Sequence, residues 1–234
     1  MLAIVAPMAT ELSGIRRAIR DPESRGVMFS LTGVGAARAQ QGIRQVAESQ
    51  PEAIIMLGFC GGADPDLAVG DLHVASCFKA PGAVDSIPAD PELLSAWLTA
   101  ARSCGARVVS GPSATVDAVA GPAAKSELRR SAGVASVNME DYSAADTARA
   151  LGIPFVSVRA VLDDATTELP RHLPEDPDNI ARTLASLAIH PERIPAMLHL
   201  ASSARTARQS LTRCSLEAID CLTAPRTELS AVPR

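Results

Sequence analysis

Short runs of consecutive apolar residues alternate along the chain with segments in which apolar residues recur every three to four positions. The apolar runs, which are typical of buried strands, lie at residues 2–6, 27–31, 53–57, 71–77, 107–110, 135–138 and 155–162. The helical spacing occurs at residues 10–20, 36–48, 93–103, 122–130 and 139–151. Apolar strands separated by helices are typical of a sheet that is covered on both faces. The pattern predicts a three-layer α/β fold with a largely parallel or mixed central sheet flanked by helices.

The alternation of strands and helices stops after Asp164. Residues 169–178 are rich in Pro and Asp and predict a loop, whereas residues 180–187 and 194–211 predict two helices. We therefore expect residues 1–222 to form a single α/β domain, in which residues 165–222 are a C-terminal helical extension. Residues 223–234 are expected to be a disordered tail.

The composition excludes several classes of function. Aromatic residues make up 3% of the chain and the formal net charge is -4, whereas a nucleic-acid surface needs aromatic residues beside a basic patch. No apolar stretch approaches the roughly 18–20 residues of a membrane span, and the first residues lack the basic start of a signal peptide. The five cysteines form no CxxC pair, and the four histidines show no zinc-binding spacing. We expect a cytoplasmic protein with reduced thiols and no metal or other cofactor.

Three acidic residues follow the ends of predicted strands, where ligands bind in open α/β sheets. Glu11 lies in the first turn of the helix after the first strand, and Glu140 begins the helix after residues 135–138. Asp163 ends the last predicted strand. Each carboxylate alone is also compatible with helix capping or a favourable interaction with the helix dipole. Their expected convergence at one edge of the sheet is what indicates a site.

Two glycine-containing segments are expected at the same edge. Gly33-Val-Gly35 is not a dinucleotide-binding fingerprint, because Arg38 stands at the position of the third glycine. The segment Gly58-Phe-Cys-Gly-Gly62 is predicted to be a loop whose backbone N–H groups can approach an anion or a sugar oxygen. Cys60 in this segment is interpreted as a small packing residue, because no histidine lies nearby in the sequence to activate a thiol.

These segments together resemble the nucleoside phosphorylase and nucleosidase superfamily, which includes purine nucleoside phosphorylase and methylthioadenosine nucleosidase. Four segments carry the resemblance, in this order: Ile4-Val-Ala-Pro-Met-Ala-Thr-Glu11, Gly33-Val-Gly35, Gly58-Phe-Cys-Gly-Gly62 with Ala68-Val-Gly-Asp71, and Val137-Asn-Met-Glu140 with Pro154-Phe-Val-Ser-Val-Arg-Ala-Val-Leu-Asp163. Two further segments resemble the hopanoid-associated phosphorylase branch, namely Asp117-Ala-Val-Ala-Gly-Pro-Ala-Ala-Lys125 and His190-Pro-Glu-Arg-Ile-Pro-Ala-Met-Leu198.

The resemblance implies roles for particular residues. Asp163 would donate a proton to N7 of the purine, Glu140 would hold the ribose hydroxyls, and Glu11 would lie near the nucleophile. Arg159 would lie behind the sugar or bind an anionic nucleophile. The remaining candidates for substrate binding are Met139, Phe59, Cys60, Gly61 and Gly35.

The function implied is cleavage of the N-glycosidic bond of a purine nucleoside by a glycosyltransferase. The first candidate is phosphorolysis of a 5′-substituted, adenosylhopane-like adenosine in hopanoid biosynthesis, with inorganic phosphate as co-substrate and adenine as product. Many phosphorylases have an arginine just before the glycine-rich segment, where this chain has Met56-Leu57. Phosphate-independent hydrolysis of methylthioadenosine or S-adenosylhomocysteine is therefore the alternative.

A non-catalytic nucleoside-binding relative is a third reading. It is motivated by Asn138, where the family usually has Asp, and by Leu162, where nucleosidases usually have a small polar residue. Because family members are usually dimers or hexamers, the resemblance also implies a homodimer or higher homo-oligomer. The only other partner expected is the nucleoside substrate.

Overall fold

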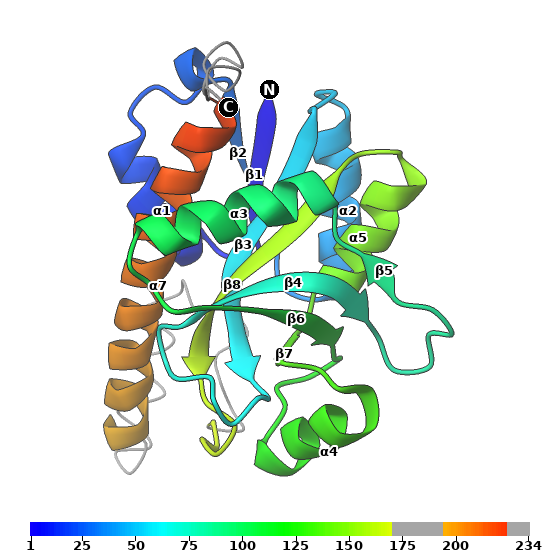
Figure 1. Ribbon diagram of the computed structural model, residues 1–234, viewed down its shortest axis with the longest axis vertical. Helices are drawn as coiled ribbons and strands as arrows, with labels where there is room; N and C mark the ends of the chain where they lie inside the picture. Colours follow the sequence, from blue (N-terminus) through cyan, green and yellow to red (C-terminus); the bar gives the residue numbers. More distant parts are fainter. Residues whose placement is uncertain (170–193, 224–234) are drawn as a thin grey trace, which may run out of the picture.

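The computed structural model describes residues 1–169 and 194–223, and a mixed sheet forms its centre (Figure 1). Eight strands make up this sheet in the described residues: β1 (Leu2–Ala6), β2 (Val27–Leu31), β3 (Ala53–Gly62), β4 (Leu72–Lys79), β5 (Ile87–Pro88), β6 (Val108–Thr115), β7 (Ser136–Asn138) and β8 (Phe155–Asp163). The residues of β1 are all buried, as are most of those in β3 and β8. Burial on both faces explains why these strands are continuous apolar runs in the sequence.

The pairing of the strands closes part of the sheet into a ring. β1 pairs in parallel with β2 and β3, and β8 lies between β3, which is parallel to it, and β4, which is antiparallel. β6 pairs in parallel with β4 and β7, and β7 returns to the end of β3 through the antiparallel pairs Gly61–Val137 and Gly62–Ser136. The C-terminal ends of β3 and β8 therefore lie where the ring closes.

Helices cover the sheet on two flanks. The helices are α1 (Ala9–Ala18), α2 (Ala36–Ala47), α3 (Pro91–Ser103), α4 (Pro122–Ala132), α5 (Asp141–Ala150) and α7 (Ile194–Thr223), together with the short 3₁₀ helix η1 (Glu23–Arg25). α7 packs against α1, α3 and β8, whereas α2 packs against α5 (Figure 1). The predicted α/β fold, with a central sheet, flanking helices and a C-terminal helix, is confirmed. None of the described helices has the length and hydropathy needed to span a membrane.

The largest error of the sequence prediction concerns residues 58–62. The predicted loop is instead the second half of β3, because it pairs with β8 along one edge and with β7 at its end. β5 was not expected, and β6 continues beyond its predicted end to Thr115. α7 likewise continues past residue 211 to Thr223. The predicted helix at 180–187, and nearly all of the predicted loop and tail, lie outside the described residues.

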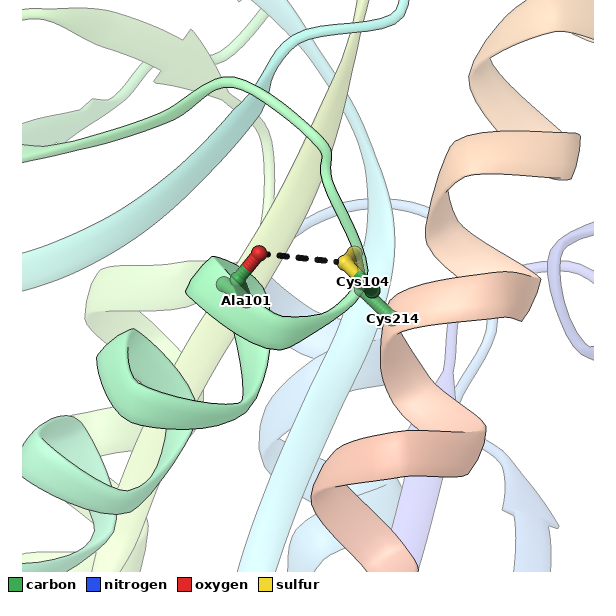
Figure 2. Close-up of a disulfide and its surroundings, with 3 residues drawn as sticks. All are labelled: Ala101, Cys104 and Cys214. Atoms are coloured by element: carbon green, nitrogen blue, oxygen red, sulfur yellow. Dashed lines mark hydrogen bonds between the residues drawn. A yellow bond between two sulfur atoms is a disulfide. The ribbon is translucent and has the colours of Figure 1, made fainter.

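Two of the five cysteines form a disulfide, which corrects the expectation of reduced thiols. Cys104 at the end of α3 is bonded to Cys214 on α7 (Figure 2), and 110 residues separate the two in the sequence. Their Cα atoms are 5.6 Å apart because α3 packs against α7, and that spacing is ordinary for a disulfide. Figure 2 also shows Cys104 Sγ close to the carbonyl oxygen of Ala101, at 3.2 Å. Cys60, Cys77 and Cys221 are free.

Candidate active site

Glu11 is a buried carboxyl at the start of α1, directly beyond the end of β1. Its side chain accepts two backbone hydrogen bonds, from Phe59 N to Oε1 and from Met8 N to Oε2, each 2.8 Å long. Burial raises the pKa of Glu11 from 4.5 to about 7, with a further contribution from Glu140, although Arg159 and the two backbone donors lower it. A carboxyl that titrates near neutral pH can accept a proton during a reaction and release it afterwards, as a general base must.

Arg159 on β8 is a buried cation surrounded by protein acceptors. Its Nε and Nη2 donate to Asp141 Oδ1, and Nη2 also lies 3.2 Å from Glu140 Oε2. Its Nη1 donates to the carbonyl oxygen of Phe59 at 3.2 Å. Burial lowers the pKa of Arg159, but the attraction of Asp141, Glu140 and Glu11 outweighs this and raises it above its ordinary value. We call Glu11, Glu140, Asp141 and Arg159 the Arg159 cluster.

Glu140 is anchored through both of its carboxylate oxygens. It lies between β7 and α5, where Oε1 accepts a hydrogen bond from Gly35 N at 3.0 Å and Oε2 faces Arg159. Gly35 precedes α2 and has a φ of 94°, a conformation that favours glycine over any other residue. The neighbouring Met139 is only partly buried. The Gly33-Val-Gly35 turn therefore holds a carboxylate of the protein in place.

The hydrogen bonds of Asn138 explain why this chain can have Asn where the family usually has Asp. Its Oδ1 accepts hydrogen bonds from the backbone N atoms of Glu140 and Asp141, and its Nδ2 donates to Asp141 Oδ2 at 2.8 Å and to Ser113 Oγ. An aspartate at this position would have no hydrogen atom to donate and would place a second negative charge against Asp141. The amide of Asn138 is therefore suited to orient Asp141, which in turn binds Arg159.

Asp163 lies at the end of β8 with a partner that the sequence did not reveal. Lys125 of α4 is buried, and its Nζ binds Asp163 Oδ2 and donates to the carbonyl oxygen of Asp164 at 2.6 Å. Burial raises the pKa of Asp163 above its ordinary value, and this effect and the nearby Asp164 outweigh the lowering by Lys125. Asp163 is therefore held as one member of a buried pair with Lys125.

Two glycines of β3 allow these charged groups to approach the strand closely. A Cβ on Gly58 would lie 2.5 Å from Arg159 Nη1 and 2.8 Å from Glu11 Oε1, and a Cβ on Gly61 would lie 2.9 Å from Lys125 Cε. Gly58 and Gly61 are three residues apart, which corresponds to about 10 Å along a strand. The Arg159 cluster and the Lys125–Asp163 pair thus lie at successive positions along β3. The sequence predicted that all three carboxylates converge in one crevice at the strand ends; in the structure Glu11 lies beside Gly58, and Asp163 pairs with Gly61 further along β3.

The two other candidates on β3 differ in character. Phe59 is partly buried against the main core, and its backbone N and O contact Glu11 and Arg159. Cys60 is buried in a small apolar cluster that includes Leu67 and Val161. Burial raises the pKa of Cys60 to about 12, so this sulfur carries no charge at neutral pH. These surroundings support the interpretation of Cys60 as a packing residue.

The fold and the site define an α/β protein with buried carboxylates grouped at the ends of its central strands. Residues 23–190 match the family model of the Phosphorylase superfamily, and the chain belongs to this superfamily. The resemblance seen in the sequence is thereby confirmed, as is the expectation that the chain is an enzyme. The narrower resemblance to the hopanoid-associated branch is not confirmed by these comparisons.

Two proteins similar to this chain are nucleosidases. The chain is 28% identical over 201 residues to a 5′-methylthioadenosine/S-adenosylhomocysteine nucleosidase of Chromohalobacter salexigens, covering 71% of this chain and 86% of that protein. It is also 28% identical over 208 residues to the enzyme of the same name from Pseudoalteromonas translucida, covering 74% and 88%.

Solved structures agree on the fold. The nucleosidase of the same name from Neisseria meningitidis, in complex with methylthio-immucillin-A, has a TM-score of 0.73 and 21% identity, covering 93% of this chain and 97% of that one. Futalosine hydrolase of Helicobacter pylori has a TM-score of 0.71 and 15% identity, covering 94% and 97%. In residues 1–169 and 194–223, no group of three or more His, Cys, Asp or Glu side chains is placed to hold a metal ion.

Proposed function

We propose that the chain hydrolyses the N-glycosidic bond of an adenine nucleoside of the methylthioadenosine or S-adenosylhomocysteine type. The observation that carries this proposal is Glu11, a buried carboxyl whose pKa lies at about 7 and which two backbone N–H groups hold in place. Such a group suits the activation of a water molecule. The two nucleosidases that resemble this chain over about 200 residues support the same reading.

The proposed reaction conserves atoms and charge. The oxygen of water forms a bond to C1′ of the ribose while the bond between C1′ and N9 breaks, and its electron pair goes to the purine. The proton from water goes to Glu11, and N7 of the purine takes a proton from Asp163. Positive charge develops on the ribose in the transition state, and the carboxylate of Glu140 would stabilise it more than it stabilises the ground state.

The placement of these groups along β3 is compatible with a nucleoside lying beside this strand. The ribose would lie near Glu11 and Glu140 at the level of Gly58, and the purine would lie near Asp163 at the level of Gly61. Met139 and Phe59 are both partly buried, and they remain candidates for contact with the sugar and the base.

The electrostatics of the Arg159 cluster favour water over phosphate. Arg159 uses Nε, Nη1 and Nη2 to contact protein acceptors, and three carboxyl groups surround it. A phosphate dianion placed there would face these carboxyl groups, and Arg159 would have to give up existing partners to bind it. The phosphorolysis of an adenosylhopane-like nucleoside, which the sequence resemblance implied, is therefore less well supported than hydrolysis.

Assembly and location are also part of the proposal. The family resemblance implies a homodimer or a higher homo-oligomer. The cysteine pattern of the sequence favours a cytoplasmic location, and the pattern of strands and helices favours residues 1–222 as one domain. The disulfide between Cys104 and Cys214 counts against a cytoplasmic location, because disulfides are rare in a reducing compartment. Sedimentation analysis and thiol quantification of protein taken directly from its native cells would test these two points.

Release of adenine from methylthioadenosine, S-adenosylhomocysteine and adenosylhopane tests the proposal. We expect release from the first two, and we expect Asp163→Asn and Glu140→Gln each to reduce turnover at least tenfold. Asp146→Asn is the matched control, since Asp146 is a partly exposed acid of α5 whose ion-pair partner within the described residues is Arg149. If neither site variant reduces turnover tenfold, the catalytic assignment is wrong. Binding of nucleosides without cleavage would support the non-catalytic reading.

A further inference from the structure

Lys125 is buried to an extent that is rare for lysine. Its side chain is 1% exposed, and it is one of two lysines in the chain. Lysines are almost never fully buried unless they are paired, because removing an ammonium group from water is costly. Lys125 is paired: its Nζ binds Asp163 Oδ2 and donates to the carbonyl oxygen of Asp164 at 2.6 Å.

The backbone around Lys125 leaves room for this contact. The lysine side chain passes beside Gly61 of β3, where a Cβ would lie 2.9 Å from Lys125 Cε and 3.3 Å from Nζ. Gly61 pairs with Asp163 across β3 and β8, immediately after an irregularity between Cys60 and Gly61. The strand that carries the candidate substrate-binding residues is therefore shaped to admit the lysine to the carboxyl of Asp163.

The contact uses only one oxygen of Asp163. Lys125 binds Oδ2, and within the described residues no hydrogen bond reaches Oδ1. A protonated carboxyl can accept the lysine at Oδ2 and carry its proton on Oδ1. The Lys125 contact therefore leaves Oδ1 to carry the proton that is given to a base.

Within the described part of the chain, three titratable groups face Asp163 from the surrounding elements. They are Lys125 from α4, Asp164 directly after β8, and Cys60 from β3. Burial raises the pKa of Asp163, whereas its hydrogen bond and charge interaction with Lys125 lower it. Of these three groups, Lys125 is the one that stabilises the ionised form of Asp163.

We propose that Lys125 is a positioning residue for the reaction, holding Asp163 toward the purine and stabilising the carboxylate that forms when Asp163 gives its proton to N7. This inference rests on the proposed function. The proton moves from Asp163 Oδ1 to N7, the electron pair of the O–H bond stays on the carboxylate, and the ammonium of Lys125 keeps its own protons. A proton from solvent later restores Asp163.

The lysine should therefore act mainly on the chemical step. Negative charge develops on Asp163 in the transition state, so an ammonium beside it contributes more there than in the ground state. Hydrogen bonds to charged groups are worth about 1.5–3 kcal/mol, which corresponds to a loss of about 10- to 150-fold on removal. For Lys125→Met we expect kcat to fall by that factor, and KM to change less than about threefold.

The pH dependence gives a second readout with a defined sign. The reaction needs Asp163 protonated, so the rate falls on the alkaline side as Asp163 ionises. Removing Lys125 removes an influence that lowers the pKa of Asp163. In Lys125→Met the alkaline fall in kcat should therefore move to higher pH. A merely structural role for Lys125 would lower activity without moving this fall.

The experiment compares Lys125→Met with two further variants in the full chain. Lys79→Met is the matched control, because Lys79 donates to the carbonyl oxygen of Ala132 at the end of the same helix and has no contact with Asp163. We expect this control to retain the kcat and pH profile of the wild type. In Asp163→Asn, the addition of Lys125→Met should reduce kcat by less than about twofold, because the group on which the lysine acts is gone.

Several outcomes would overturn the inference. One such outcome is a folded Lys125→Met whose kcat, and whose fall in kcat at alkaline pH, match those of the wild type. Another is a loss of kcat on Lys125→Met that is equally large in the wild type and in Asp163→Asn. If thermal unfolding shows that Lys125→Met does not fold, Lys125→Gln, which keeps a polar contact without the charge, is read by the same criteria. A wild type that releases no base from any nucleoside overturns the proposed function and this role together.

Discussion

Replacing Glu11 by Gln should change the pH dependence of folding stability. The pKa of Glu11 rises from 4.5 to about 7 on folding, chiefly because the side chain is buried. The folded chain thus binds this proton more tightly than the unfolded chain, so the favourable contribution is complete below pH 4.5 and is lost as pH rises through about 7. At 1.36 kcal/mol for each pKa unit, the ionised group costs about 3.4 kcal/mol above pH 7.

Urea unfolding at pH 4.5 and at pH 8 measures this effect. Between these two pH values, we expect Glu11→Gln to gain about 3 kcal/mol in free energy of unfolding relative to the wild type. Glu48→Gln, at the exposed end of α2, is the matched control for the loss of one carboxylate. A difference between Glu11→Gln and the wild type that stays constant within 1 kcal/mol would refute the reasoning.

Three further predictions concern the groups around this site and the disulfide. Gly58→Ala places a Cβ 2.5 Å from Arg159 Nη1, so it should lower the free energy of unfolding in urea by about 1–3 kcal/mol. The control Gly121→Ala places its Cβ in open space and should leave this free energy unchanged. Equal losses in the two variants would contradict the prediction. Asp141→Asn removes the negative charge that the buried Arg159 contacts through Nε and Nη2, so it should cost about 3–5 kcal/mol in urea unfolding; a loss below 1 kcal/mol would argue against the ion pair. Reducing the Cys104–Cys214 disulfide, whose cysteines are 110 positions apart in the sequence, should lower stability by about 2–5 kcal/mol. An unchanged free energy of unfolding after reduction would contradict this contribution.

Most of the sheet could be predicted from the sequence because burial on both faces leaves a local signal. The apolar runs at residues 2–6 and 155–162 correspond to β1 and β8 within one residue. The loop prediction for residues 58–62 was wrong because it relied on their glycines, which are typical of loops. Their strand conformation depends on pairing with β8 and β7, whose residues lie far away in the sequence.

The candidate site shows the same division between local and distant signals. Glu11 and Glu140 could be predicted as site residues because each follows the end of a predicted strand. In the structure both interact electrostatically with Arg159. Lys125 could not be assigned to Asp163, because 38 residues and an intervening helix separate them. In the sequence, Asp141 is an acidic residue in the first turn of a predicted helix, which is compatible with a favourable interaction with the helix dipole alone. Its contact with Arg159 depends on the three-dimensional fold.

In the proposed reaction, the nucleophile is a water molecule activated by Glu11. This proposal is tested most directly by measuring adenine release from methylthioadenosine in phosphate-free buffer and again with added phosphate, with the sugar product examined by ³¹P NMR. We expect equal rates in the two buffers, a sugar product without phosphorus, and a rate at least about 100-fold lower in Glu11→Gln. Adenine release that requires phosphate and yields a sugar 1-phosphate would contradict it.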